Sequence, residues 1–167
     1  ERPGKWVAEP CWPSPHIAES CFVLDKGRLA PGSEQIATQP LPIQSPLGVG
    51  LFAGKWCSYQ APPDLPHDQR QEDGGALVFE SPFLEEDLEI FGAPRVELEL
   101  ASSQPVAQVA VRLSDVAPDD KATRVTYGLL NLTHRESHEH PQPLEPNQRY
   151  RISGQLNGVA QRFPKGH

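Results

Sequence analysis

The sequence predicts an all-β fold, either a sandwich or a barrel of short strands. Apolar and polar residues alternate over short segments that recur at spacings of about ten residues, the pattern of such folds. No segment carries three turns of amphipathic helix. The 19 prolines among the 167 residues exceed the average share of roughly 5% about twofold, which favours short strands and many turns.

The first half of the chain predicts few regular elements. Residues 1–20 are rich in Trp and Pro and follow neither the helical nor the strand period, so we interpret them as an extended connector. Residues 21–29 predict a short hairpin with Lys26 and Gly27 at its turn. Residues 30–75, dominated by Pro, Gly and Gln, predict loop with one or two short strands.

Strands become clearer after residue 75. Short apolar runs at 77–79 and 88–90 are bounded by turn residues and predict two strands. Residues 95–100 predict the clearest strand of the chain, since apolar side chains occupy one face and charged side chains the other. The apolar face comprises Val96, Leu98 and Leu100.

A β-meander is predicted to follow. Residues 108–113 repeat the alternation, residues 118–121 form a turn, and residues 122–133 form the next strand. The apolar phase shifts within that last strand, which requires a bulge near Gly128 or burial on both faces. Residues 150–153 predict the last clear strand. The ending resembles the approach to a further strand, so we expect a sheet that lacks its last strand.

Composition excludes several functions. The net charge is -7 and no Lys/Arg cluster occurs, so we expect no nucleic-acid partner. No apolar run is long enough to span a bilayer, and we expect no membrane association. The three cysteines (Cys11, Cys21 and Cys57) are odd in number and describe no disulfide framework, which favours a cytoplasmic location. The absence of methionine suggests an N-terminus internal to a longer product.

Several segments together carry a resemblance to a known family. The chain resembles the C-terminal domain of the X-prolyl dipeptidyl-peptidase and cocaine-esterase (CocE/NonD) serine hydrolases, strongly over residues 68–167 and weakly before them. No single motif is diagnostic, but the order and spacing of the segments are specific. They are residues 68–70, 77–79, 88–92, 96–98, 111–116, 126–128, 134–137, 144–146 and 163–167.

The resemblance implies a fold and a function. Members carry an α/β-hydrolase domain with a Ser-His-Asp triad, a helical cap, and a C-terminal jelly roll similar to galactose-binding domains. Only the jelly roll matches here, so residues 1–20 are expected to connect a missing hydrolase domain to a jelly-roll domain over residues 21–167. The expected role is a non-catalytic accessory domain that packs on the hydrolase and cap domains of its parent chain. A homodimer through an exposed strand edge is a further expectation.

No catalytic residue or cofactor is assigned to this chain. A hydrolase nucleophile needs a Gly-x-Ser-x-Gly elbow, and that pentapeptide does not occur. The resemblance implies that the parent hydrolyses an ester or amide through an acyl-enzyme on its own serine, with acyl esters, X-Pro peptides or β-lactam side chains as substrates.

Two clusters admit a metal hypothesis, although we assign no metal site. His134, His138 and His140 offer imidazole ligands for zinc or copper, but they precede a Pro-rich turn, where polar residues are ordinary, and lack the His-Glu-x-x-His order. The acidic run of residues 85–87 (Glu85, Glu86, Asp87) offers oxygen ligands for calcium, but such runs more often form a solvated turn.

Aromatic residues leave a carbohydrate-binding module as the alternative function. Trp6, Trp12 and Trp56 offer faces for sugar rings, although filling a domain junction is the preferred interpretation. The Asp68-Gln69-Arg70 segment either bonds across that junction or locks a local turn. The Asn131-Leu132-Thr133 glycosylation sequon lies inside a predicted strand, and we interpret it as chance.

Overall fold

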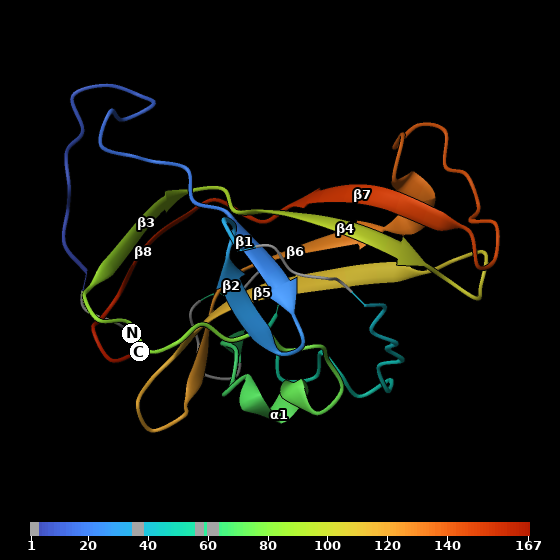
Figure 1. The fold of residues 1–167 in the computed structure, drawn as a ribbon, viewed down its shortest axis with the longest axis horizontal. Coiled ribbons are helices and arrows are strands. Elements are labelled where there is room, and N and C mark those ends of the chain that lie inside the picture. Colours follow the sequence, from blue (N-terminus) through green and yellow to red (C-terminus); the bar gives the residue numbers. More distant parts are fainter. Residues whose placement is uncertain (1–3, 35–38, 56–58, 60–63) are drawn as a thin grey trace. The chain divides into compact units, whose positions relative to one another are not determined.

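The computed structural model describes residues 4–34, 39–55, 59 and 64–167 (Figure 1). The chain divides into two compact units. Unit 1 comprises Glu1–Leu41 and Phe79–Ser81, and unit 2 comprises Pro42–Val78 and Pro82–His167. Trp56 and Cys57 lie outside the described residues. No helix within the described part of the chain is both long and apolar enough to cross a membrane.

Unit 1 contains the predicted hairpin. Strand β1 (Phe22–Asp25) pairs antiparallel with β2 (Arg28–Pro31). The two turn residues, Lys26 and Gly27, have φ values of 35° and 84°, as a two-residue turn that matches the strand twist requires. The prediction of a hairpin over residues 21–29 is therefore confirmed.

The strand predicted over residues 77–79 does not form. Only Glu80 is paired, through one parallel bridge to Arg28, with its N–H donating to Gly27 O at 2.9 Å. Pro82 follows two residues later, and proline has no N–H to donate and disfavours many conformations of the residue before it. The prediction was wrong because an apolar run becomes a strand only where a neighbouring strand can form a series of backbone hydrogen bonds with it.

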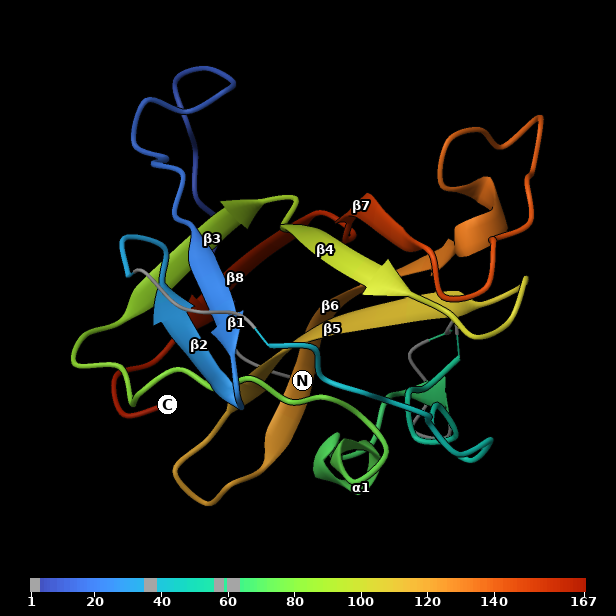
Figure 2. The ribbon, with the colours of Figure 1, turned by 45° about the vertical axis from the view of Figure 1, so that its right-hand side comes forward.

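Unit 2 consists of nested antiparallel strand pairs, which Figures 1 and 2 show. The innermost pair is β5 (Gln108–Val116) with β6 (Ala122–Asn131). Around it lie β4 (Arg95–Ala101) with β7 (Arg149–Gln155), and β3 (Leu88–Gly92) with β8 (Val159–Phe163). This nesting of a folded double ribbon is the topology of a jelly roll.

The nesting differs from the sequence prediction at two points. A meander was expected, but β4 pairs with β7 and not with its sequence neighbour β5. Residues 150–153 were predicted as the last clear strand, and β8, for which no strand was predicted, follows them. Gln161 lies at the centre of β8 and interrupts its apolar residues, so the sequence showed no clear strand pattern there.

Strand β6 contains a bulge, but not near Gly128. Leu113 pairs with Thr126 while Ser114 pairs with Arg124, so Val125 is the extra residue. The bulge lies three residues before the predicted position. The strand also ends at Asn131, whose side chain accepts from Thr133 N at 3.1 Å and opens the short 3-10 helix η2 (Leu132–His134).

The core lies between the β4–β7 and β5–β6 pairs. Leu132, Leu144 and Ile152 are buried at its centre. Leu98 pairs with Ile152, so the apolar face predicted for residues 95–100 is the one that faces the core. The side chains packed around this centre are Leu98, Leu100, Ala107, Val109, Leu130 and Tyr150.

Candidate functional site

A loop of unit 2, residues 42–55, carries apolar side chains that the described structure leaves in solvent. Leu47 is fully exposed and Leu51 is 78% exposed. Ile43 and Phe52 are also exposed, at 54% and 37%. Single exposed apolar residues are ordinary, but a close group of them marks an interaction surface. We refer to residues 42–55 as the apolar loop.

The backbone of the apolar loop is held by a buried carboxylate. Glu72 lies in the one-turn helix α1 (Arg70–Asp73) and is 1% exposed. Its Oε1 accepts from Phe52 N at 2.7 Å and its Oε2 accepts from Gly50 N. Gly50 has φ 106°, a conformation that favours glycine. Charged acceptors make the stronger hydrogen bonds, so this clamp fixes the loop while its side chains point outward.

A buried amide next to Glu72 adds a second fixation. Gln69 is 1% exposed, and its Nε2 donates to Phe52 O at 3.1 Å and to His67 O at 2.8 Å. Its Oε1 accepts from Arg112 Nη1 of β5 at 2.8 Å. Every polar atom of this side chain is therefore used, and α1 is tied both to the apolar loop and to the sheet.

Asp68 and Arg70 resolve one alternative from the sequence. Arg70 Nε and Nη2 donate to Asp68 Oδ2 at 2.9 and 2.6 Å, which is the local turn lock. Asp68 Oδ1 also accepts from Ala122 N of β6 at 3.1 Å. The hydrogen bonds from the Arg70 guanidinium, helped by those from the backbone N–H groups of Arg70 and Ala122, lower the pKa of Asp68 to about 2.

The pKa of Asp73, at the end of α1, is shifted in the opposite direction. Burial raises its pKa, and the Arg112 guanidinium at 3.8 Å offsets part of that effect. The two carboxylates flanking this one-turn helix thus differ because Asp68 has close donors and Asp73 is desolvated.

The histidine cluster does not assemble into a ligand set. The rings of His134 and His138 lie 5.6 Å apart between centroids, and His140 is exposed in the following turn. Within the described residues, no group of three or more His, Cys, Asp or Glu is arranged to hold a metal ion.

The acidic run at residues 85–87 has a structural partner. Asp87 Oδ2 accepts from Arg162 Nε at 3.1 Å, and Oδ1 accepts from Lys165 N at 2.8 Å. Asp87 therefore fixes the start of β3 to the end of β8. In unit 1, Trp6 and Trp12 are exposed, and the third residue of that hypothesis, Trp56, is outside the described residues.

One pair in unit 2 was missed by sequence reasoning. The Asp115 side chain is fully buried in β5, and its Oδ1 lies 2.8 Å from His167 Nδ1. Leu84 N donates to His167 O at 2.8 Å, so both ends of this residue are held. The separation of 52 residues leaves no local signal, and Asp115 lies beyond the strand predicted over residues 108–113.

The nested strand pairs of unit 2 define a β-sandwich domain of the jelly-roll type. The chain belongs to the family described as the X-Pro dipeptidyl-peptidase C-terminal non-catalytic domain, which matches residues 1–167. The resemblance, the jelly-roll sandwich and the non-catalytic role predicted from the sequence are thereby confirmed.

Solved structures agree with this assignment. The chain is similar to an alpha-amino acid ester hydrolase, with 32% identity and a TM-score of 0.57 over 60% of this chain and 18% of that one. An aminopeptidase from a marine sediment archaeon, Thaumarchaeota archaeon, shares the fold at 22% identity, with a TM-score of 0.72 over 98% of this chain and 30% of that one. The chain thus spans less than a third of either protein.

No curated protein matches the chain. The similar structures are hydrolases, and the comparisons give no support to the carbohydrate-binding alternative.

Proposed function

We propose that this non-catalytic domain packs on the hydrolase and cap domains of its own parent chain and stabilises them. The observation that carries the proposal is the apolar loop, where Leu47 and Leu51 are exposed while the buried Glu72 fixes the backbone beneath them. A preorganised loop loses little conformational freedom on docking, so most of the free energy gained by burying its side chains stabilises the contact.

The parent is proposed to be a serine hydrolase that cleaves an ester or amide bond through an acyl-enzyme. Support comes from the two similar proteins, one named as an ester hydrolase and the other as an aminopeptidase. Acyl esters, X-Pro peptides and β-lactam side chains are the candidate substrates. The nucleophile belongs to the parent's hydrolase domain, because this chain contains no Gly-x-Ser-x-Gly elbow.

Residues 1–20 are proposed as the connector to that hydrolase domain, with the jelly-roll domain over residues 21–167. In favour of a connector, residues 4–21 form no helix or strand, and the side chains of Trp6, Val7 and Trp12 are exposed. Aromatic side chains with this exposure suit a domain junction, where they lose their contact with water.

The docking role is tested in the parent protein with a Leu47→Ser, Leu51→Ser double variant. Burying a leucine contributes about 1.5–3 kcal/mol, so we expect the double variant to lower the thermal stability of the parent and the lifetime of its hydrolase activity. Val106→Ser is the matched control, because Val106 is 61% exposed in the loop between β4 and β5. Equal melting temperatures for the double variant, the control and the native parent would contradict the proposal.

Two finer proposals accompany this role. A homodimer through a free strand edge is supported by the pairing of the described strands in twos, which leaves strand edges available. Sedimentation as a monomer at high concentration would contradict it.

A cytoplasmic location is supported by the free thiols of Cys11 and Cys21. If Cys11 and Cys21 do not react with an alkylating reagent inside cells because they are oxidised, that location is contradicted.

A further inference from the structure

The short connection between β7 and β8 contains an asparagine followed by a glycine. Asn157 and Gly158 are both exposed. The chain has three asparagines, Asn131, Asn147 and Asn157, and only the last precedes a glycine. The side-chain amide of an asparagine can be attacked by the backbone nitrogen of the next residue, and glycine hinders this attack least because it has no Cβ. The sequence therefore favours such a reaction at Asn157.

The structure separates the three asparagines by the hydrogen bonding of that backbone nitrogen. Leu132 N, which follows the first asparagine, donates to Ala107 O at 3.0 Å. Gln148 N, which follows the second, donates to Glu145 O at 3.1 Å. Within the described part of the chain, Gly158 N has no hydrogen-bond acceptor. Of the three nitrogens, Gly158 N is therefore the one that attacks its neighbouring side chain without first losing a hydrogen bond.

We propose that Asn157 is a site of spontaneous deamidation. Gly158 N forms a bond to Cγ of Asn157, the Cγ–Nδ2 bond breaks, and ammonia leaves with the proton of Gly158 N. Water, which reaches this exposed connection, then opens the cyclic succinimide at either carbonyl. The products are aspartate or isoaspartate, and in isoaspartate the main chain runs through Cβ and Cγ. This modification is independent of the accessory role.

The backbone of Asn157 is held against β6, so the isoaspartate product disturbs it. Asn157 N donates to Tyr127 O at 3.0 Å, and Asn157 O accepts from Thr126 Oγ1 at 2.8 Å. In isoaspartate, this carbonyl becomes a free carboxylate and the path to β8 gains one carbon atom. Thr126 is 4% exposed, so the new charge lies beside a buried hydroxyl, where charges are costly.

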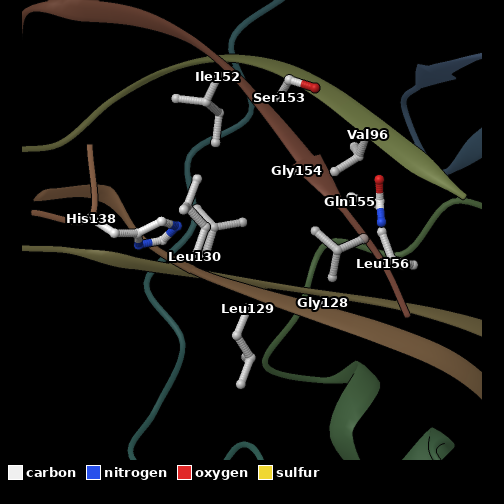
Figure 3. A pocket seen from close by; sticks show the side chains of 12 residues that line it. Val96, Gly128, Leu129, Leu130, His138, Ile152, Ser153, Gly154, Gln155 and Leu156 are labelled. Atoms are coloured by element: carbon white, nitrogen blue, oxygen red, sulfur yellow. The ribbon is translucent and has the colours of Figure 1, made fainter. Parts of the chain in front are cut away.

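The segment before Asn157 leaves no room for the added atom. Figure 3 shows Gln155 and Leu156 beside Gly128 of β6. A Cβ on Gly128 would lie 2.9 Å from Gln155 O and 3.2 Å from Leu156 Cα. Leu156 N also donates to Pro94 O at 2.8 Å. The longer path is therefore accommodated on the side of β8, and isoaspartate loosens β8 from its partner β3.

The site is tested by peptide mapping with mass spectrometry after incubation of the intact protein at neutral pH. Aspartate and isoaspartate should form at Asn157 about tenfold faster than at Asn131 and Asn147, which are the internal controls. Gly158→Ala should slow the reaction about tenfold, because its methyl group hinders the attack. This variant should fold, since the added Cβ would lie no closer than 3.9 Å to Gly92 O and φ of Gly158 is outside the range that favours glycine.

The effect on β8 is tested on the isoaspartate form, separated chromatographically from the aspartate and unmodified forms. Its β8 amides should exchange faster with deuterium, and its melting temperature should be lower. A freshly prepared Asn157→Asp variant is the matched control, because it carries the negative charge on an ordinary backbone and should melt like the native protein. Equal rates at the three asparagines, or an unchanged rate in Gly158→Ala, would overturn the site. Equal melting temperatures of the isoaspartate and unmodified forms would overturn its effect on β8.

Discussion

Glycines that look equivalent in the sequence have different roles in this molecule. Gly128 and Gly154 both lie on inner strands opposite a valine. Gly128 permits the close approach of Gln155, while a Cβ on Gly154 would meet Val96 Cγ1 at an ordinary 3.5 Å. Two aspartates, in contrast, have the same role: Asp87 and Asp68 each accept hydrogen bonds from an arginine side chain and from a backbone N–H.

Alanine substitutions separate the two glycines. Gly128→Ala should destabilise the protein, because a Cβ 2.9 Å from a carbonyl oxygen forces the strands apart. Gly154→Ala should stabilise it by about 0.4–1 kcal/mol, because alanine lowers the entropy of the unfolded chain and its Cβ would meet Val96 Cγ1 at an ordinary 3.5 Å. Urea unfolding of both variants measures the difference. Equal destabilisation by both would show that the space beside Gly154 is not available.

Asp68 predicts a pH dependence at the residue scale. Its pKa is lowered to about 2 in the folded protein, while an unfolded aspartate titrates near about 3.9. The ionised group therefore stabilises the fold at pH above about 4, and this contribution is lost as the pH falls toward about 2. Urea unfolding between these pH values should show a shallower loss of stability for Asp68→Asn than for the native protein. Parallel curves would rule out the contribution.

At the scale of elements, helix α1 is too short to be stable alone and depends on its contacts. A helix of four residues cannot repay the cost of nucleation, which explains why the sequence carried no helical signal there. Gln69 and Glu72 connect it to the apolar loop, and Arg112 of β5 connects it to the sheet. Buried polar side chains, not an apolar face, therefore decide the position of this element.

Removal of Arg112 tests this dependence. Arg112→Ala leaves Gln69 Oε1 without its donor in a buried position, at a cost of about 1–3 kcal/mol. Arg151→Ala is the matched control, since the Arg151 side chain is 80% exposed and an ion pair as exposed as the one it forms with Glu97 adds little to stability. Denaturant unfolding gives both values, and faster exchange of the Phe52 amide should accompany the first variant alone. Equal effects would contradict the role of the buried amide.

At the scale of the whole molecule, nested pairing brings distant segments together. β3 pairs with β8 across most of unit 2, and Asp87 and Asp115 bond to Arg162 and His167 at separations of 75 and 52 residues. Contacts of such separation are costly in loop-closure entropy and slow folding. The centre between the layers must therefore supply much of the stability of unit 2.

Leu132 lies in that centre and is 2% exposed. Leu132→Ala should cost about 2–5 kcal/mol, since it removes buried methyl groups and leaves a cavity between the layers. That is a large fraction of the roughly 5–15 kcal/mol that stabilises a typical domain. Thermal unfolding measures the loss. A cost no larger than that of the exposed Leu129→Ala would show that the layers are not held together at Leu132.

The sequence by itself determined the elements whose pattern is local. The hairpin at residues 21–29 and the core face of Val96, Leu98 and Leu100 follow from turn chemistry and from the two-residue period of a strand. The strands near residues 88–90, 108–113 and 150–153 were found for the same reason. Resemblance over the ordered segments supplied the family.

Tertiary structure alone decided which strands pair, where the bulge lies and how the apolar loop is held. Strand partners depend on backbone hydrogen bonds that any residue except proline can make, so β4 carries no sequence mark that selects β7 over β5. The bulge at Val125, the clamp of Glu72 and the pair of Asp115 with His167 join residues that only the folded chain brings together. Local periodicity determines which face of a strand is buried, whereas long-range contacts determine which strand lies next to it.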